Sequence, residues 1–192
     1  MNRFPRKDTL LEVFQWRIEK SSSDIAFKFN EQDLTYGEYD LRANQVANGL
    51  INEGCLPNSR VAVLAKNSVS YAEIIFGSLK TRTALVGLNW RLAGPEVIFV
   101  VNDSESEVLF VGPDFYELVD SVKDQFTHVK RIIAMDESHD VWQSYSSWRD
   151  ASNNIDPELQ GHADDDVIQL YTSGTTGHPN GVRVTNKNIN AS

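Results

Sequence analysis

From Arg60 onward the chain alternates short apolar runs with amphipathic helical patterns, and this alternation restricts the fold more than any other feature. The runs cover residues 61–65, 84–88, 108–111, 129–134 and 167–171, and most of them are apolar on successive residues. Strands of that kind are buried on both faces, and helices between them provide the crossovers that parallel strands need. The pattern therefore predicts an α/β fold, a doubly wound parallel sheet covered by helices.

The first 59 residues follow a different pattern. Two Thr-x-x-Glu capping boxes, at Thr9–Glu12 and Thr35–Glu38, each predict the start of a helix. Between them, Ile25–Phe29 has the alternation of a half-buried strand that leads into a hairpin. We therefore predict that residues 1–59 are a helix–hairpin–helix segment of a neighbouring sub-domain and that residues 60–192 are the doubly wound sub-domain. The hairpin would have an exposed sheet edge, through which the chain could self-associate.

Composition argues against several classes of function. A formal net charge of −9 with no block of basic residues argues against a nucleic-acid partner. The single cysteine fits a reducing compartment, and no apolar run reaches the length of a membrane span. Residues 1–13 include basic side chains but no apolar segment follows them, so they do not resemble a secretory signal. We therefore predict a cytoplasmic protein without a membrane span.

No spacing of potential ligands predicts a metal site. The four histidines stand singly, without a partner at i+4 or a nearby cysteine. Asp164, Asp165 and Asp166 precede a predicted strand, and a solvated strand entrance is the preferred interpretation of these carboxylates. We expect Cys55 to be a half-buried packing residue rather than a catalytic thiol. The sequence assigns no catalytic residue.

A loop rich in glycine and hydroxyl side chains follows the last apolar run, within Tyr171–Val182. Glycine lets the backbone turn so that several amide groups point at one spot, and serine and threonine add short donors. Such a loop suits a polyphosphate. The chain contains neither Gly-Lys-Ser/Thr nor G-x-G-x-x-G, so the loop is not that of the common NTPases or of the dinucleotide-binding fold.

The loop resembles the ATP-phosphate loop of the adenylate-forming, or AMP-binding, ligases. These include acyl- and aryl-CoA synthetases and the adenylation domains of peptide synthetases, and their pattern is Tyr/Phe-Thr-Ser-Gly-Ser/Thr-Thr-Gly-x-Pro-Lys-Gly-Val. The resemblance implies that the ATP phosphates are bound by Thr172, Ser173, Gly174, Thr175, Thr176, Gly177 and Asn180. Asn180 is the departure from the pattern, because the family has lysine there. This change removes a cation from the phosphate contact.

The resemblance extends over nearly the whole chain from about Thr9. Leu88–Leu92 reads Leu-Asn-Trp-Arg-Leu, which is similar to the acyl-CoA synthetases, whereas peptide-synthetase adenylation domains usually carry a Leu-Asp-Pro version. The resemblance thus implies the amino-terminal part of the acyl-CoA synthetase-like fold. Those ligases are more than twice as long, so we expect an amino-terminal fragment. Asn186 occupies a position where histidine is common, and we expect it to alter packing around the acyl group or the nucleotide.

The resemblance implies that the parent protein is an ATP-dependent carboxylate–CoA ligase of fatty acid metabolism. A small-molecule carboxylate attacks the α-phosphate of ATP, pyrophosphate leaves, and the acyl-adenylate is passed to the thiol of CoA. ATP and CoA are the implied co-substrates, and Mg²⁺ is held by residues outside this chain. We expect the fragment alone to be inactive. Two alternatives remain: a non-catalytic remnant that binds a nucleotide or a partner protein, and an adenylation domain that loads a carrier protein, which Leu88–Leu92 disfavours.

Overall fold

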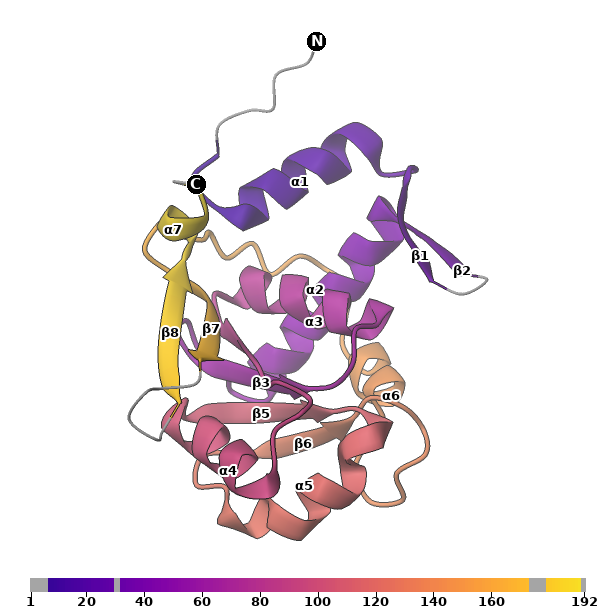
Figure 1. Ribbon diagram of the computed structural model, residues 1–192. Helices are drawn as coiled ribbons and strands as arrows, with labels where there is room; N and C mark the ends of the chain where they lie inside the picture. The colour runs from indigo at the N-terminus through magenta and orange to yellow at the C-terminus, as the bar shows by residue number, and fades with distance from the viewer. Residues whose placement is uncertain (1–6, 30–31, 173–178, 191–192) are drawn as a thin grey trace.

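The computed structural model describes residues 7–29, 32–172 and 179–190, and its main feature is a central sheet (Figure 1). Within these ranges the strands of the sheet are β3 (Arg60–Leu64), β4 (Ala84–Gly87), β5 (Ser106–Val111), β6 (Arg131–Ala134), β7 (Asp166–Thr172) and β8 (Asn180–Thr185). Their order is β6-β5-β3-β4-β7-β8. Strands β3 to β7 are parallel and lie at the predicted apolar runs. The predicted doubly wound fold is confirmed.

The sequence analysis does not predict β8, which pairs antiparallel with β7 and makes the sheet mixed rather than wholly parallel. The signal for a strand is nevertheless present. Val182 and Val184 alternate with Arg183 and Thr185, as in a strand whose two faces differ in polarity. The strand lies at the edge of the sheet directly after the Gly- and Ser/Thr-rich loop.

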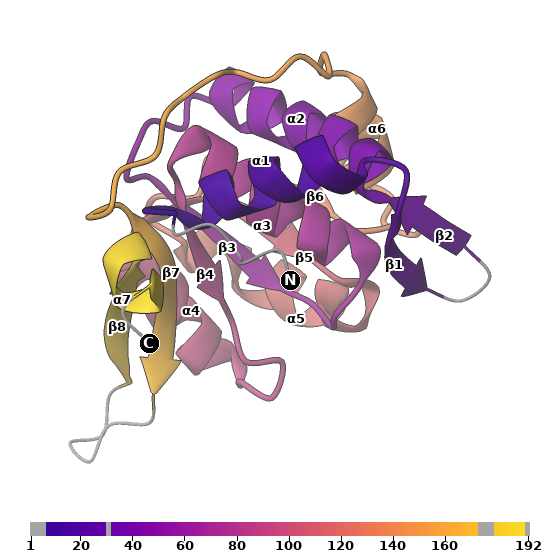
Figure 2. The same ribbon diagram turned by 90° about the horizontal axis from the view of Figure 1, so that it is seen from above.

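Helices cover both faces of the central sheet (Figure 2). Their bounds are α1 (Leu10–Ser21), α2 (Tyr36–Asn52), α3 (Val69–Thr81), α4 (Gly94–Asp103), α5 (Tyr116–Val122), α6 (Tyr145–Asp150) and α7 (Asn186–Asn190), with 3₁₀ turns at Pro113–Phe115 and Lys123–Gln125. Side chains of α2, α3 and α6 pack on one face, and those of α4 and α5 pack on the other. The crossovers thus lie on both faces, with α3 and α6 on one and α4 and α5 on the other, as in a doubly wound sheet.

The central strand β3 explains why the predicted strands are apolar at successive positions. Val61 and Val63 face the core shared with α2, α3 and α6, whereas Ala62 and Leu64 face the core shared with α4 and α5. All four side chains are fully buried. Burial of a valine or leucine side chain contributes about 1.5–3 kcal/mol, so each face of the strand stabilises the fold.

The amino-terminal segment forms the predicted helix–hairpin–helix. Thr9 and Thr35 cap α1 and α2 in the two capping boxes. Strands β1 (Ile25–Phe29) and β2 (Gln32–Thr35) form an antiparallel sheet of their own, separate from the central sheet. Helix α2, however, packs Val46 into the same core as β3. The division of the chain at residue 60 therefore stays a prediction, with α2 shared between the two parts.

Three local features complete the description of these elements. Helix α3 begins at Val69 and is capped by Ser68, because the amide of Tyr71 donates to the Ser68 hydroxyl. Asp114 lies in a 3₁₀ turn and forms an ion pair with Lys66. The polar stretch before β7 contains α6, whose Trp148 is 4% exposed.

A buried carboxylate joins the three helices on one face of the sheet. Glu73 of α3 is 1% exposed. Its Oε1 accepts a hydrogen bond from Nη1 of Arg42 on α2 at 3.1 Å. Its Oε2 accepts from the hydroxyl of Tyr145 at 2.7 Å and from Nη1 of Arg149 at 3.0 Å, both on α6. The charge of Glu73 is thus matched by two guanidinium groups in a place that water does not reach.

A second buried charge holds the long connection between α6 and β7. The ammonium of Lys80 on α3 is buried and lies 2.5 Å from Oδ2 of Asp156 and 3.0 Å from Oδ1 of Asp40 on α2. Nearby, the side-chain amides of Asn44 and Asn48 donate to backbone carbonyls of the connection. These contacts attach the connection to α2 and α3.

We predict that Glu73→Gln destabilises the protein strongly. The amide cannot neutralise Arg42 and Arg149, and removing one partner of a buried ion pair typically costs about 3–5 kcal/mol. Urea denaturation measures the free energy of unfolding. The control is Glu117→Gln on the exposed face of α5, which should change this free energy by no more than about 0.5 kcal/mol. Equal effects of the two substitutions would contradict the role given to Glu73.

Candidate functional site

The β7–β8 hairpin places the candidate phosphate loop at the carboxyl end of the parallel strands. The last pairs of its ladder are Tyr171 with Gly181 and Thr172 with Asn180. Strand β7 therefore ends, and β8 begins, at the carboxyl end of the parallel strands (Figure 2). In open α/β sheets, ligands bind outside this end of the strands.

Two of the predicted ATP-contact residues are brought together. Thr172 and Asn180 are opposite each other in the ladder, and both are exposed. Opposite residues of an antiparallel pair have their side chains on the same face, with Cβ atoms about 4.5–5.5 Å apart. The other predicted contacts, Ser173, Gly174, Thr175, Thr176 and Gly177, lie outside the described residues.

Gly181 allows a tyrosine ring to lie across the base of this loop. A Cβ atom at Gly181 would lie 2.8 Å from Nε2 of Gln169 and 3.1 Å from Cζ of Tyr171. Both distances are too short for ordinary contact, so any larger residue would displace one of these side chains. The sequence analysis did not identify this close approach. Gly181 belongs to the loop pattern and so was a signal in the sequence. Its partner, Tyr171, is known only once β8 is paired with β7.

The hydroxyl of Tyr171 is held from two sides. It donates to Oδ2 of Asp103, at the end of α4, over 2.7 Å and accepts from Nε2 of Gln169 over 2.8 Å. The ring also meets the edge of Phe99 on α4, with centroids 6.5 Å apart. Burial raises the pKa of Tyr171, and the hydrogen bond to Asp103 raises it further, so the phenol stays protonated and keeps donating.

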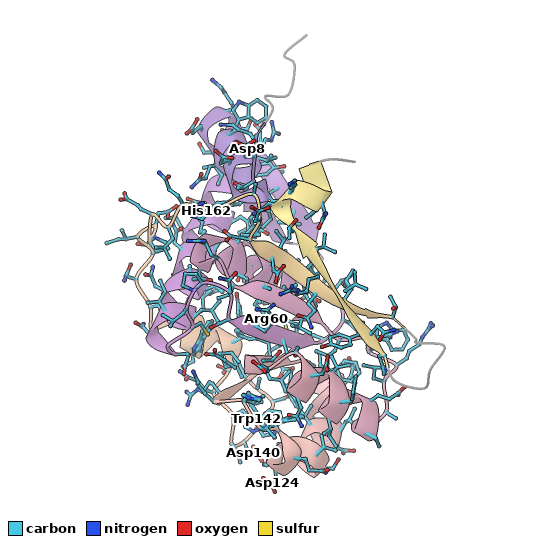
Figure 3. The ribbon with its side chains drawn as sticks, turned by 90° about the vertical axis from the view of Figure 1, so that its left-hand side faces the viewer. Asp8, Arg60, Asp124, Asp140, Trp142 and His162 are labelled. Carbon is cyan, nitrogen blue, oxygen red and sulfur yellow. The ribbon has the colours of Figure 1, made fainter. Side chains whose placement is uncertain are left out.

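The hydrogen-bonded chain continues toward the amino ends of the strands. Oε1 of Gln169 accepts from Nε of Arg60 at 3.3 Å. Arg60, labelled in Figure 3, also pairs with Asp166 at 2.9 Å, and Arg183 approaches the same carboxylate at 3.4 Å. These charges connect the central strand β3 with β7 and β8 near the amino end of β7.

The acidic run before β7 is not the solvated strand entrance that was expected. Asp165 is 7% exposed, and its carboxylate binds the Arg82 guanidinium through two hydrogen bonds of 2.8 and 2.9 Å. Burial raises the pKa of Asp165, but the hydrogen bonds from Arg82 and from the His162 amide outweigh it, so the pKa lies below its usual value. Across the described ranges, no group of three or more His, Cys, Asp or Glu side chains could hold a metal ion.

Asn186 joins distant parts of the chain. Its Oδ1 accepts from the amide of Leu10 at the start of α1 over 3.1 Å, and its Nδ2 donates to the carbonyl of His162 over 2.9 Å. The side chain is 4% exposed. It thus links the first helix, α7 and the segment before β7, and an effect of Asn186 on packing around a substrate stays a prediction.

Two other residues of interest have structural roles. Cys55 is buried more deeply than expected, at 4% exposed, and burial together with the charge of Glu107 raises the pKa of its thiol to about 12. Asn89 of the Leu88–Leu92 segment accepts a hydrogen bond from the amide of Arg91 and so shapes a turn. Among the helices that the structure describes, none is both long and apolar enough to cross a membrane.

Comparison with known proteins assigns the chain to a family. Residues 14–192 match the AMP-binding enzyme family. A fatty acid–acyl-carrier-protein ligase (ScoC) of Streptomyces coeruleorubidus is 34% identical over 93% of this chain and 33% of its own length. A long-chain-fatty-acid–CoA ligase of Mycobacterium tuberculosis is 31% identical over 82% of this chain and 31% of its own length.

The fold is similar to that of a solved relative. The structure of a Mycobacterium tuberculosis fatty acyl CoA synthetase superposes with a TM-score of 0.84 and 28% identity, over 93% of this chain and 35% of the other. The chain thus spans about a third of the length of the relatives that it matches, and it corresponds to their amino-terminal part. The sequence match and the doubly wound sheet agree, and the chain belongs to the AMP-binding enzyme family.

Proposed function

We propose that the full-length protein is an ATP-dependent ligase that activates a carboxylic acid as its acyl-adenylate and transfers the acyl group to the thiol of CoA. The observation that supports this most is the Thr172–Asn180 pair, from which a loop with the family's sequence leaves the carboxyl end of β7. Two similar relatives are ligases for fatty acids, which favours a fatty or related acid as substrate.

In this proposal the loop binds the β- and γ-phosphates of ATP with neutral donors. The hydroxyls of Thr172, Ser173, Thr175 and Thr176 and the amides of Gly174 and Gly177 donate to phosphate oxygens. These preorganised donors stabilise the charge that develops as pyrophosphate leaves, and no covalent step uses the loop. Mg²⁺ and CoA are bound by parts of the protein outside this chain.

The second candidate for the acyl acceptor is the thiol of a carrier protein. The 34% identity to a fatty acid–acyl-carrier-protein ligase favours it, whereas the Leu-Asn-Trp-Arg-Leu segment favours CoA. Carboxylate-dependent exchange of pyrophosphate into ATP tests adenylation for both acceptors. Incubation of the full-length protein with acid, ATP and either CoA or a carrier protein then distinguishes them by the thioester formed. A protein that exchanges no pyrophosphate with any acid would support the non-catalytic remnant.

We propose that the full-length protein works in the cytoplasm. We make two further proposals about the 192-residue chain on its own. We propose that it has no ligase activity, because the loop provides only part of an ATP site. We also propose that it self-associates through the β1–β2 sheet. Ile25 and Phe29 of β1 are each 44% exposed, and an unpaired strand edge can pair with a second copy.

We predict that the 192-residue chain binds ATP with a dissociation constant of about 1 mM or weaker. A few neutral hydrogen bonds contribute about 0.5–1.5 kcal/mol each, and ordering the loop offsets part of this. The resulting binding free energy is about −4 kcal/mol. Isothermal titration calorimetry measures it, with pyrophosphate as the phosphate-only ligand. A low-micromolar constant for ATP would show that the chain holds a more complete site.

We predict that Asn180→Lys in the full-length protein strengthens binding of ATP and of pyrophosphate. An ammonium offers a charge-assisted hydrogen bond where the amide offers a neutral one. At an exposed strand end screening reduces the gain to about 1 kcal/mol, roughly fivefold in affinity, and the gain should shrink as salt rises.

The matched control for Asn180→Lys is Gln160→Lys, which makes the same change from amide to ammonium at an exposed position before the other end of β7. It should leave both affinities unchanged at moderate salt. If the two variants behave alike, or if Asn180→Lys changes neither ATP affinity nor the exchange rate at low salt, position 180 does not face the phosphates.

A further inference from the structure

The side chains below the phosphate loop form one directed series of hydrogen bonds on the face covered by α4. Gln169 and Tyr171 are two residues apart on β7, so both side chains point to the face covered by α4. On β8, Arg183 pairs with Gln169 and Gly181 pairs with Tyr171. Figure 1 shows α4 beside the ends of β7 and β8 from which the loop leaves, and Figure 2 shows α4 on the same side. A helix from an earlier part of the chain thus contacts the strand that ends in the loop.

The hydrogen bonds of this series all run in one direction. The guanidinium of Arg60 donates to Oε1 of Gln169, the Gln169 amide donates from Nε2 to the Tyr171 hydroxyl, and that hydroxyl donates to Asp103. The carboxylate can only accept, so the direction of the whole series is fixed at its Asp103 end. Networks in which every member is satisfied hold their side chains in one arrangement.

Gly181 allows these side chains to pack against the backbone at the base of the loop. Because it has no side chain, the Tyr171 ring and the Gln169 amide lie against the backbone of β8. The next pair of the ladder is Thr172 with Asn180, the two described members of the phosphate contact. An interaction that fixes the Tyr171 ring therefore also restrains the backbone of β7 and β8 at the pair next to Thr172 and Asn180.

We propose that Asp103 is a positioning residue for the phosphate loop, acting through Tyr171 to hold the Thr172–Asn180 pair and so to set the affinity for ATP. The proposal rests on the proposed function, because it assigns ATP to this loop. It adds that α4, which makes no phosphate contact in the proposed function, controls the site through a tyrosine–aspartate hydrogen bond.

The test is Tyr171→Phe in the full-length protein, which keeps the ring and removes the hydroxyl. Its matched control is Tyr116→Phe, because the Tyr116 hydroxyl donates to Asp136 over 2.8 Å, nearly the 2.7 Å of the pair at the loop, and contributes to the same face of the sheet. Both variants should lower the midpoint of thermal unfolding by similar amounts. Only Tyr171→Phe should raise the KM for ATP in pyrophosphate exchange, by about threefold to tenfold, with kcat changed less than about twofold.

Substitutions of Asp103 separate positioning from bulk stability. Asp103→Ala should match Tyr171→Phe, and the double variant should be no worse than either alone, because both remove the same hydrogen bond. Asp103→Asn keeps an oxygen that can accept from Tyr171 and should retain most of the affinity for ATP. The proposal is overturned if Tyr171→Phe and Tyr116→Phe change the KM for ATP equally, or if Asp103→Ala leaves it unchanged.

Amide hydrogen exchange without nucleotide keeps this test separate from the proposed function. Faster exchange at Thr172, Asn180 and Gly181 in Tyr171→Phe, and not in Tyr116→Phe, supports positioning of the loop base; equal exchange in both variants overturns it. If the wild-type protein exchanges no pyrophosphate with any acid, the proposed function fails, and the amide measurement alone decides whether Asp103 positions these strands.

Discussion

Burial of both faces of the parallel sheet is the constraint on which the rest of the structure depends. The central strands bury alternate side chains in two cores, so helices must cover both faces of this part of the sheet. A polar ligand can then be bound only where the chain leaves the sheet. The Gly- and Ser/Thr-rich loop is at such a place, directly after the carboxyl end of β7. The position of the candidate site is thus a consequence of how the sheet is covered.

The sequence predicts the parts of the fold that depend on local pattern. Doubly buried strands such as β3 have a strong signal, because hydrophobic periodicity reports burial directly. Strand β8 was missed because its first four residues are exposed and it follows glycine and proline residues that indicate a loop. Helix α6 was missed because it is short and its buried side chains, Tyr145 and Trp148, pack only through tertiary contacts.

The candidate site shows the same limit. The loop motif alone names Thr172 and Asn180, since it is a contiguous pattern, and the ladder brings the two together. The partners of Tyr171 come from α4 and from across the hairpin, so no spacing in the sequence reveals them. Charge pairing was misjudged at Asp165 for the same reason: Arg82 is distant in sequence and meets the carboxylate only when α3 ends beside β7.

The place of β7 in the strand order has a consequence for how the protein folds. β7 pairs with β4, although β5 and β6 come between them in the sequence, and the intervening connection must first be held by Lys80 and the asparagines of α2. Contacts between residues this distant in sequence form late in folding. The chain entropy of closing the intervening loop must be lost before these contacts can stabilise the structure. The β7–β8 hairpin can form locally and dock last, so these two strands belong to the part of the molecule that opens most readily in the native state.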